Sequence, residues 1–226
     1  VHIAPDRAIV GDVVTASAQA DYYAGGALRG APVRWWVTAT PARYSPPGWD
    51  RFTFGAEKPW WQEDFWSDDV DEVGASFEGV TGDDGRHHLA IGTDLGSDPR
   101  TWSVCAEATV EDVNRQAWTA SSSVLVHPAA LCVGVRSQRS FVTGGRPLEI
   151  ETVVVDLDGA PMPDIPVDVR AERWEHRQVA GRWQWMVAET VERGVTSGTG
   201  AVGVTLERLT PGRWTVSVEA ADGEGR

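Results

Sequence analysis

The chain has 226 residues, of which 42% are hydrophobic and 23% are charged, and its formal net charge is −13. This length and composition suffice for one large or two medium globular domains. The acidic balance, with no basic stripe, argues against a nucleic acid as the main partner. No run of residues approaches the roughly 18 apolar positions of a membrane span, so we expect no membrane contact by this stretch.

The two cysteines, Cys105 and Cys132, lie in strand-like runs in different halves of the chain. We expect both to be buried reduced thiols, because burial is the usual state of a free cysteine. A disulfide between them is the alternative, and the cysteines therefore do not identify the cellular compartment. Because the chain begins with Val1 rather than methionine, we expect a fragment or a processed piece of a longer protein.

Apolar residues that alternate with polar ones predict β-strands throughout the first half. Residues 1–12 are expected to form an edge strand that Pro5 interrupts. Residues 33–40 are the clearest strand, with Trp35 on the apolar face, where a tryptophan is typical of the core of a two-sheet sandwich. The other strands predicted in this half are residues 13–20, 77–80, 86–91, 101–110 and 117–126.

A Trp-rich insertion at about residues 41–76 separates two of these strands and carries an acidic run at residues 68–72. A loop of this length in a compact domain is either functional or packed by its own side chains. Exposed aromatic rings could stack on sugars, but here they are interleaved with proline and acidic residues rather than set at strand spacing, which favours packing. The candidate interaction surface consists of Trp49, Trp60, Trp61 and Trp66.

The second half repeats the order of the first after a boundary near His127 and Pro128, where proline ends strand hydrogen bonding. The clearest echo is Gly-Val-Thr at residues 79–81 and again at residues 194–196. Residues 194–222 are predicted to form a β-hairpin around a Pro-Gly turn. No strand is predicted after it, so we expect the second domain to lack its last strand and to leave an unpaired edge. The other strands predicted in this half are residues 131–142, 148–155, 165–174 and 183–192.

No stretch shows the 3.6-residue apolar period and the caps of a helix, whereas 24 glycines and 13 prolines fit many short strands and turns. The sequence therefore predicts an all-β protein of two consecutive immunoglobulin-like antiparallel β-sandwiches. The first would comprise residues 1–128, including the insertion, and the second residues 129–226.

The order of several short motifs resembles that of the macroglobulin (MG) domains of the α2-macroglobulin family, particularly its bacterial members. Each motif alone is degenerate, but their order extends over almost the whole chain, which makes the resemblance specific. The motifs are YYAGG at residues 22–26, GAPVRW at residues 30–35, WSVCAEATVED at residues 102–112, SVLVHP at residues 123–128, VVDLDGAP at residues 154–161 and PGRW at residues 211–214.

The resemblance implies a large protease-trapping inhibitor, in which cleavage of a bait segment triggers a rearrangement and a reactive thioester can capture the protease. MG domains would be the β-sandwich frame of that inhibitor. The family's thioester motif Cys-Gly-Glu-Gln is absent here, because Cys105 is followed by Ala-Glu-Ala and Cys132 by Val-Gly-Val. No bait segment can be assigned either. We therefore expect a structural scaffold fragment with no chemistry of its own.

The resemblance also implies partners and a location. The partners would be neighbouring domains of the same parent chain and, through the full-length protein, target proteases. The parent protein would be extracytoplasmic, either periplasmic, with or without a lipid anchor, or secreted.

Other functions find weaker support in the residues. His87 and His88 are adjacent on a predicted strand and would point to opposite faces, so they cannot share a metal ion without distortion. The acidic residues at 68–72 and 83–84 lack the spacing of a calcium-binding EF-hand loop. No nucleophile elbow, phosphate loop or dinucleotide fingerprint occurs, so we expect no enzyme, no metal and no cofactor. The main alternative is a Trp-rich carbohydrate-binding or adhesin-like β-sandwich module.

Overall fold

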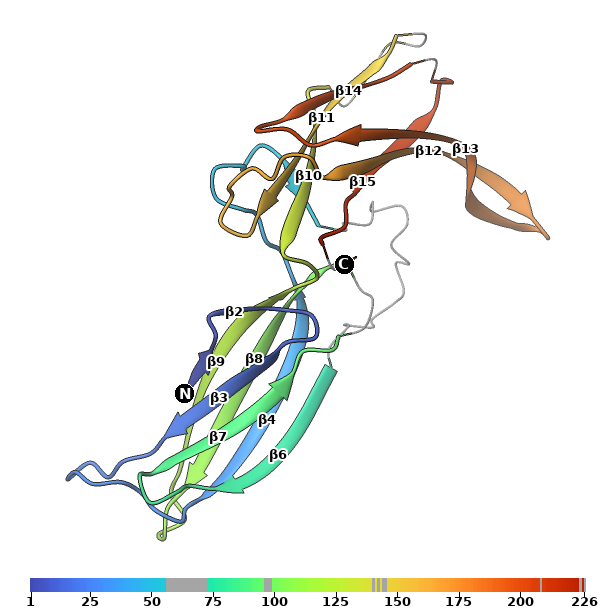
Figure 1. The fold of residues 1–226 in the computed structure, drawn as a ribbon. Coiled ribbons are helices and arrows are strands. Elements are labelled where there is room, and N and C mark those ends of the chain that lie inside the picture. Colours follow the sequence, from blue (N-terminus) through green and yellow to red (C-terminus); the bar gives the residue numbers. More distant parts are fainter. Residues whose placement is uncertain are drawn as a thin grey trace. The chain divides into compact units, whose positions relative to one another are not determined.

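The structure is a computed structural model that describes residues 1–55, 73–95, 99–139, 141, 143, 146–207, 209–223 and 225. The regular structure of these residues consists only of β-strands, as the sequence predicted (Figure 1). No helix in this part of the chain is long and apolar enough to cross a membrane.

The described residues fall into two compact units. The first unit contains residues 1–43 and 73–128, and the second contains residues 44–55 together with the chain from Ala129 onward. The chain therefore enters the second unit twice, once after Arg43 and once after Pro128.

The first unit has two sheets whose strands pair mainly antiparallel. β2 is the exception, because it lies parallel to β9. The three-stranded sheet has the order β1-β3-β7, and the five-stranded sheet has the order β2-β9-β8-β4-β6. The strands are β1 (His2–Ala4), β2 (Arg7–Ile9), β3 (Val13–Gln19), β4 (Pro32–Ala42), β6 (Val73–Val80), β7 (Arg86–Gly92), β8 (Thr101–Glu111) and β9 (Ala117–His127).

The core of the first unit follows the predicted alternation. On β4 the apolar face is buried, and Trp35 has an exposed fraction of 0%. The Trp35 indole Nε1 donates a hydrogen bond to His87 Nδ1 at 3.0 Å, so this buried polar group has a partner. Trp102 on β8 is 5% exposed and lies in the same core. The prediction that Trp35 belongs to a sandwich core is confirmed.

The second unit also has two sheets. Their orders are β14-β11-β10-β5 and β13-β12-β15, with all pairs antiparallel. The strands are β5 (Thr53–Phe54), β10 (Leu131–Ser137), β11 (Leu148–Asp156), β12 (Pro166–Val179), β13 (Arg182–Thr196), β14 (Val202–Leu206) and β15 (Arg213–Glu219). The core between them contains Leu131, Ile150, Val154, Val167, Val169, Ala171, Val204 and Leu206.

The two units share one strand order. β1, β3 and β7 correspond to β10, β11 and β14, and β8, β4 and β6 correspond to β15, β12 and β13. In the first unit β9 pairs with β8 from Ala117 to Val126. Among the described strands of the second unit, β15 pairs only with β12, so its other edge is open.

The hairpin predicted for residues 194–222 is wrong. β14 pairs with β11 in one sheet, whereas β15 pairs with β12 in the other. The Pro-Gly segment therefore carries the chain from one sheet to the other. Alternation and turn residues reveal two strands and a turn, but they do not show whether the strands pair with each other.

Candidate functional site

A short aromatic segment from the Trp-rich insertion lies against the second unit. We call residues 44–55 the strap. In sequence it follows β4 of the first unit, yet its strand β5 pairs with β10, so that Thr53 lies opposite Val135 and Phe54 opposite Gly134. The strap thus covers an edge of a sheet that would otherwise be open to another chain.

Close packing fixes the end of the strap at β5. A Cβ atom on Gly134 would lie 2.6 Å from Cε1 of Phe54, so the Phe54 ring rests directly on the backbone of β10. The guanidinium group of Arg136 lies over the ring of Phe52, at 4.9 Å from the ring centroid. This cation–π contact adds a second anchor from the same strand.

Hydrogen bonds fix the other end of the strap to the turn after β11. The Tyr44 hydroxyl donates to the carbonyl of Leu157, and Trp49 Nε1 donates to the carbonyl of Gly159 at 2.9 Å. Gly159 has a φ of +85°, and a Cβ there would lie 2.3 Å from the carbonyl oxygen of Pro47. Only glycine fits this close approach.

The turn beneath the strap is itself held by hydrogen bonds. Oδ1 of Asp156 accepts hydrogen bonds from the backbone N–H groups of Asp158, at 2.9 Å, and Ala160, at 2.8 Å. A carboxylate that bonds the backbone two residues on is a common device for fixing a turn. The strap therefore binds a preformed surface.

Of the four tryptophans predicted as an interaction surface, the structure describes Trp49. Its half-buried ring packs edge-on against Phe52, with centroids 5.4 Å apart, and its N–H group is used within the second unit. Trp60, Trp61 and Trp66 lie outside the described residues, as does the acidic run at 68–72. An interaction surface formed by the four together stays a prediction.

A projecting ribbon in the second unit was not expected. β15 pairs with β12 only from Asp168 to Trp174, whereas β12 and β13 continue past that point as a two-stranded hairpin (Figure 1). We call residues 175–186 of this hairpin the ribbon. The alternation of Trp183 and Trp185 indicated a strand, but its extension beyond the sheet depends on where β15 ends.

One face of the ribbon is an aromatic stack. The imidazole of His176 lies between Trp183, at a centroid distance of 5.1 Å, and Trp185, at 5.0 Å. The guanidinium of Arg213 lies 5.3 Å from the centroid of the Trp185 ring. The four groups therefore form one column, in the order Trp183, His176, Trp185 and Arg213.

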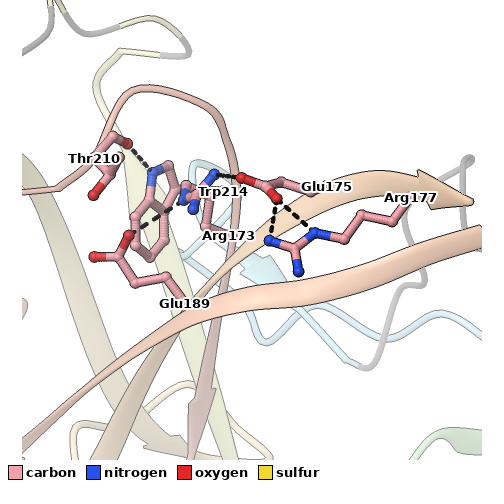
Figure 2. A network of polar contacts seen from close by, with 6 residues as sticks. All are labelled: Arg173, Glu175, Arg177, Glu189, Thr210 and Trp214. Carbon is pink, nitrogen blue, oxygen red and sulfur yellow. Dashed lines mark hydrogen bonds and ion pairs between the residues drawn. The ribbon is translucent and has the colours of Figure 1, made fainter.

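Figure 2 shows a ladder of opposite charges at the base of the ribbon, on the other face. The carboxylate of Glu175 accepts hydrogen bonds from Arg173 and from Nη2 of Arg177, the latter at 2.7 Å. Arg173 Nε also donates a hydrogen bond to Glu189 at 3.2 Å. The hydrogen bonds from Arg173 and Arg177 hold the pKa of Glu175 below its ordinary value. The charged groups of this face satisfy one another.

A cleft of about 760 Å³ opens in the second unit beside the unpaired edge of β15. Apolar residues that include Ile150 and Val216 form part of its lining, and five arginines line it without any acidic residue among the described lining groups. The strap contributes one of these arginines, Arg51. The arginines are Arg51, Arg136, Arg139, Arg146 and Arg213.

The histidines singled out from the sequence have separate partners. His87 accepts the Trp35 hydrogen bond, whereas His88 Nδ1 lies 2.8 Å from Ser17 Oγ. Among the described residues, no group of three or more His, Cys, Asp or Glu side chains could hold a metal ion.

The two cysteines are free and half-buried. Burial, reinforced by the charge of Asp156, raises the pKa of the Cys132 thiol to about 11. At neutral pH the Cys132 thiol is therefore protonated and a poor nucleophile.

Comparisons with known proteins support the family resemblance. No protein-family model matches the chain. An α2-macroglobulin homolog of the cyanobacterium Nostoc is 27% identical over 161 residues, which is 70% of this chain and 8% of that protein. A circularly permutated Ras protein of Dictyostelium discoideum is 23% identical over 67% of this chain and 4% of its own length.

Solved structures show the same fold. Trypsin-activated α2-macroglobulin from Escherichia coli matches 97% of this chain with a TM-score of 0.67 and 15% identity. Salmonella α2-macroglobulin reacted with methylamine matches 99% of it with a TM-score of 0.57 and 13% identity. This chain spans 15% and 16% of those two chains. The chain is therefore similar in sequence to the Nostoc α2-macroglobulin homolog, and it shares the all-β fold of a region of the bacterial α2-macroglobulin structures.

Proposed function

We propose that the chain is a frame region of an α2-macroglobulin-like inhibitor that traps proteases. The observation that carries this proposal is the likeness of nearly the whole chain, both units included, to one stretch of the E. coli protein. We propose that the region has no chemistry of its own. It spaces and orients the neighbouring domains of the parent chain, and target proteases are partners of the parent protein.

The strap gives this frame a route for transmitting movement. Its sequence lies between β4 and β6 of the first unit, but its side chains are bound to β10 and to the Asp156–Ala160 turn of the second. The strap is joined to the first unit through its chain connection to β4 and is held in the second unit by these contacts. We infer that rearrangement after bait cleavage acts on this segment.

The open edge of β15 supports a further part of the proposal. The equivalent strand β8 of the first unit pairs with β9 on that side, and apolar side chains packed on the core of the second unit, such as Val135 and Val216, line the cleft that β15 borders. We propose that a strand of the parent chain completes the second sandwich there. The parent protein would work outside the cytoplasm, as the family resemblance implies.

The test uses the parent protein with a protease such as trypsin. Trapping is measured as co-elution of the protease with the parent and as loss of hydrolysis of a protein substrate. Replacing this region by a rigid spacer of equal length should abolish trapping. Equal trapping with the spacer would contradict the proposed role.

A finer test addresses the strap alone. Gly159→Ala should weaken trapping, because it displaces the strap, whereas the matched Gly181→Ala change should not, because a Cβ at Gly181 meets no atom within 4 Å. Both glycines have nearly the same positive φ, +85° and +83°. Equal trapping by the two variants would remove the strap from the mechanism.

A further inference from the structure

The ribbon is a piece of structure that cannot be explained by the core of its own unit. Residues 175–186 extend beyond β15, and a hairpin of two strands is at best marginally stable in water without a third partner. Nevertheless it carries two tryptophans, and Trp183 is 63% exposed. A sheet face of this composition is typical of a surface that another protein surface covers.

The two faces of the ribbon differ in chemistry. Residues that pair across an antiparallel ribbon share a face, so His176 and Trp185 lie on one face with Gln178 and Trp183. Glu175, Arg177 and Gln184 lie on the other face. The first face contains no carboxylate, whereas the second is charged and internally paired.

The geometry of the rings argues against a sugar as the ligand of the aromatic face. A sugar needs a flat, open ring face on which to stack. In the column, His176 occupies one side of Trp183 and one side of Trp185, and Arg213 lies over the Trp185 ring. Trp183, at the end of the column, keeps one ring face without a stacked neighbour among the described residues, and a single ring of this kind offers little area to a sugar but suits contact with an apolar protein surface.

We propose that the aromatic face of the ribbon docks on a neighbouring domain of the parent chain. The inference rests on the proposed function, because it requires a parent with further domains. The matched E. coli chain is long enough for further domains, since this chain spans only 15% of it. A face without carboxylates also fits an acidic partner surface, such as one on a domain with the composition of this chain, whose net charge is −13.

The rate of limited cleavage by trypsin measures how accessible the ribbon is. Arg177 and Arg182 are exposed in the present chain, and Arg115, in the exposed turn after β8, provides a reference site. The rates of cleavage at the three sites are compared between the 226-residue chain and the parent protein. We expect cleavage at Arg177 and Arg182 to be at least tenfold slower in the parent, and cleavage at Arg115 to change less than twofold.

Two matched variants of the parent separate docking from general stability. Gln178→Glu places a charge on the aromatic face, and Gln184→Glu places the same charge on the opposite face. Gln178→Glu should restore the fast cleavage at Arg182, whereas Gln184→Glu should leave the ribbon protected. Trp183→Ala, which removes the more exposed of the two tryptophans, should act like Gln178→Glu.

Three results would overturn the proposal. The first is equally fast cleavage of the ribbon in the parent and in the short chain. The second is self-association of the short chain that Trp183→Ala abolishes, because the partner would then be a second copy. The third is Trp183-dependent binding of the short chain to a glycan array. Protease trapping by the parent is measured separately. If the parent traps proteases while its ribbon is freely cleaved, docking is refuted but the proposed function is not. If the ribbon is protected but the parent traps nothing, the proposed function is refuted but docking is not.

Discussion

Replacing Gly159 by alanine tests the strap most sharply. The added Cβ would lie 2.3 Å from the carbonyl oxygen of Pro47, and ordinary contact begins near 3.4 Å. The strap backbone must therefore move by about 1 Å, which disrupts the 2.9 Å hydrogen bond from Trp49 and the bond from Tyr44. Gly159 also has a positive φ, which alanine adopts only with strain.

The magnitude follows from these two effects. A left-handed backbone conformation costs alanine about 1–2 kcal/mol. Loss of one or two neutral hydrogen bonds adds about 1–2 kcal/mol to the fall in the free energy of unfolding. Gly181→Ala has the backbone strain but no clash, because no atom lies within 4 Å of its Cβ position. The difference between the variants, about 1–2 kcal/mol, is the contribution of strap contact.

Calorimetry and urea unfolding followed by circular dichroism provide the measurement, since the two units can unfold in separate transitions. For a unit of about 100 residues, 1 kcal/mol shifts the melting temperature by roughly 4–8 °C. The transition of the second unit should therefore fall further for Gly159→Ala than for Gly181→Ala. Equal shifts would show that the strap does not lie on this turn.

Three further predictions address single groups. Trp49→Phe should lower the free energy of unfolding by about 1 kcal/mol, because it removes the hydrogen bond to Gly159 but keeps an aromatic ring; the control Trp36→Phe, at an exposed indole, should cost less than about 0.5 kcal/mol. Burial and the charge of Arg7 lower the pKa of His127, so the folded state favours the neutral ring. The free energy of unfolding should therefore fall as the pH drops below 6.5, the ordinary pKa of histidine. His127→Gln should make the free energy of unfolding depend less on pH in this range. The pKa of the Cys132 thiol rises from 9.0 to about 11 in the folded chain, so less of it is thiolate. Iodoacetamide at about pH 8 should therefore alkylate Cys132 about 100-fold more slowly in the folded chain than in urea. Similar rates in the two conditions would contradict the burial of Cys132.

The sequence predicted much of the sandwich because burial imposes period-two alternation on each strand. Val33, Trp35 and Val37 alternate with residues that face the other way, and the structure buries all three while Trp36 between them is 51% exposed. The repeated order of strands was visible in the sequence for the same reason, because corresponding strands of the two units each bury one apolar face. The fold class and the family resemblance were therefore accessible from the residues alone.

Pairing between strands was less accessible, because alternation does not identify a partner. The predicted hairpin at 194–222 has its two strands in different sheets. The assignment of the strap to the second unit depends on Gly134 and Gly159, which are separated from it by about 80 to 110 residues. In the sequence alone, glycine at these positions indicates a weakened strand or an ordinary turn, because the strap residues that pack against it are not known.

The ribbon shows the same limit. Trp183 and Trp185 predict a strand, but the stack with His176 and Arg213 requires the register of two hairpin strands and of β15. The ladder of Arg173, Glu175 and Glu189 likewise joins residues that only the register brings together. Charged residues at this spacing would otherwise be read as a solvated face.

We propose that this region belongs to the moving frame of a protease-trapping inhibitor and that the strap transmits the movement. Hydrogen exchange of the parent protein before and after protease cleavage tests it most directly, at the backbone amides of residues 53–54 and 134–135, where β5 pairs with β10. We predict that exchange at these amides changes on cleavage while the buried core of β11 stays protected. Trapping of the protease with unchanged exchange at the strap would contradict it.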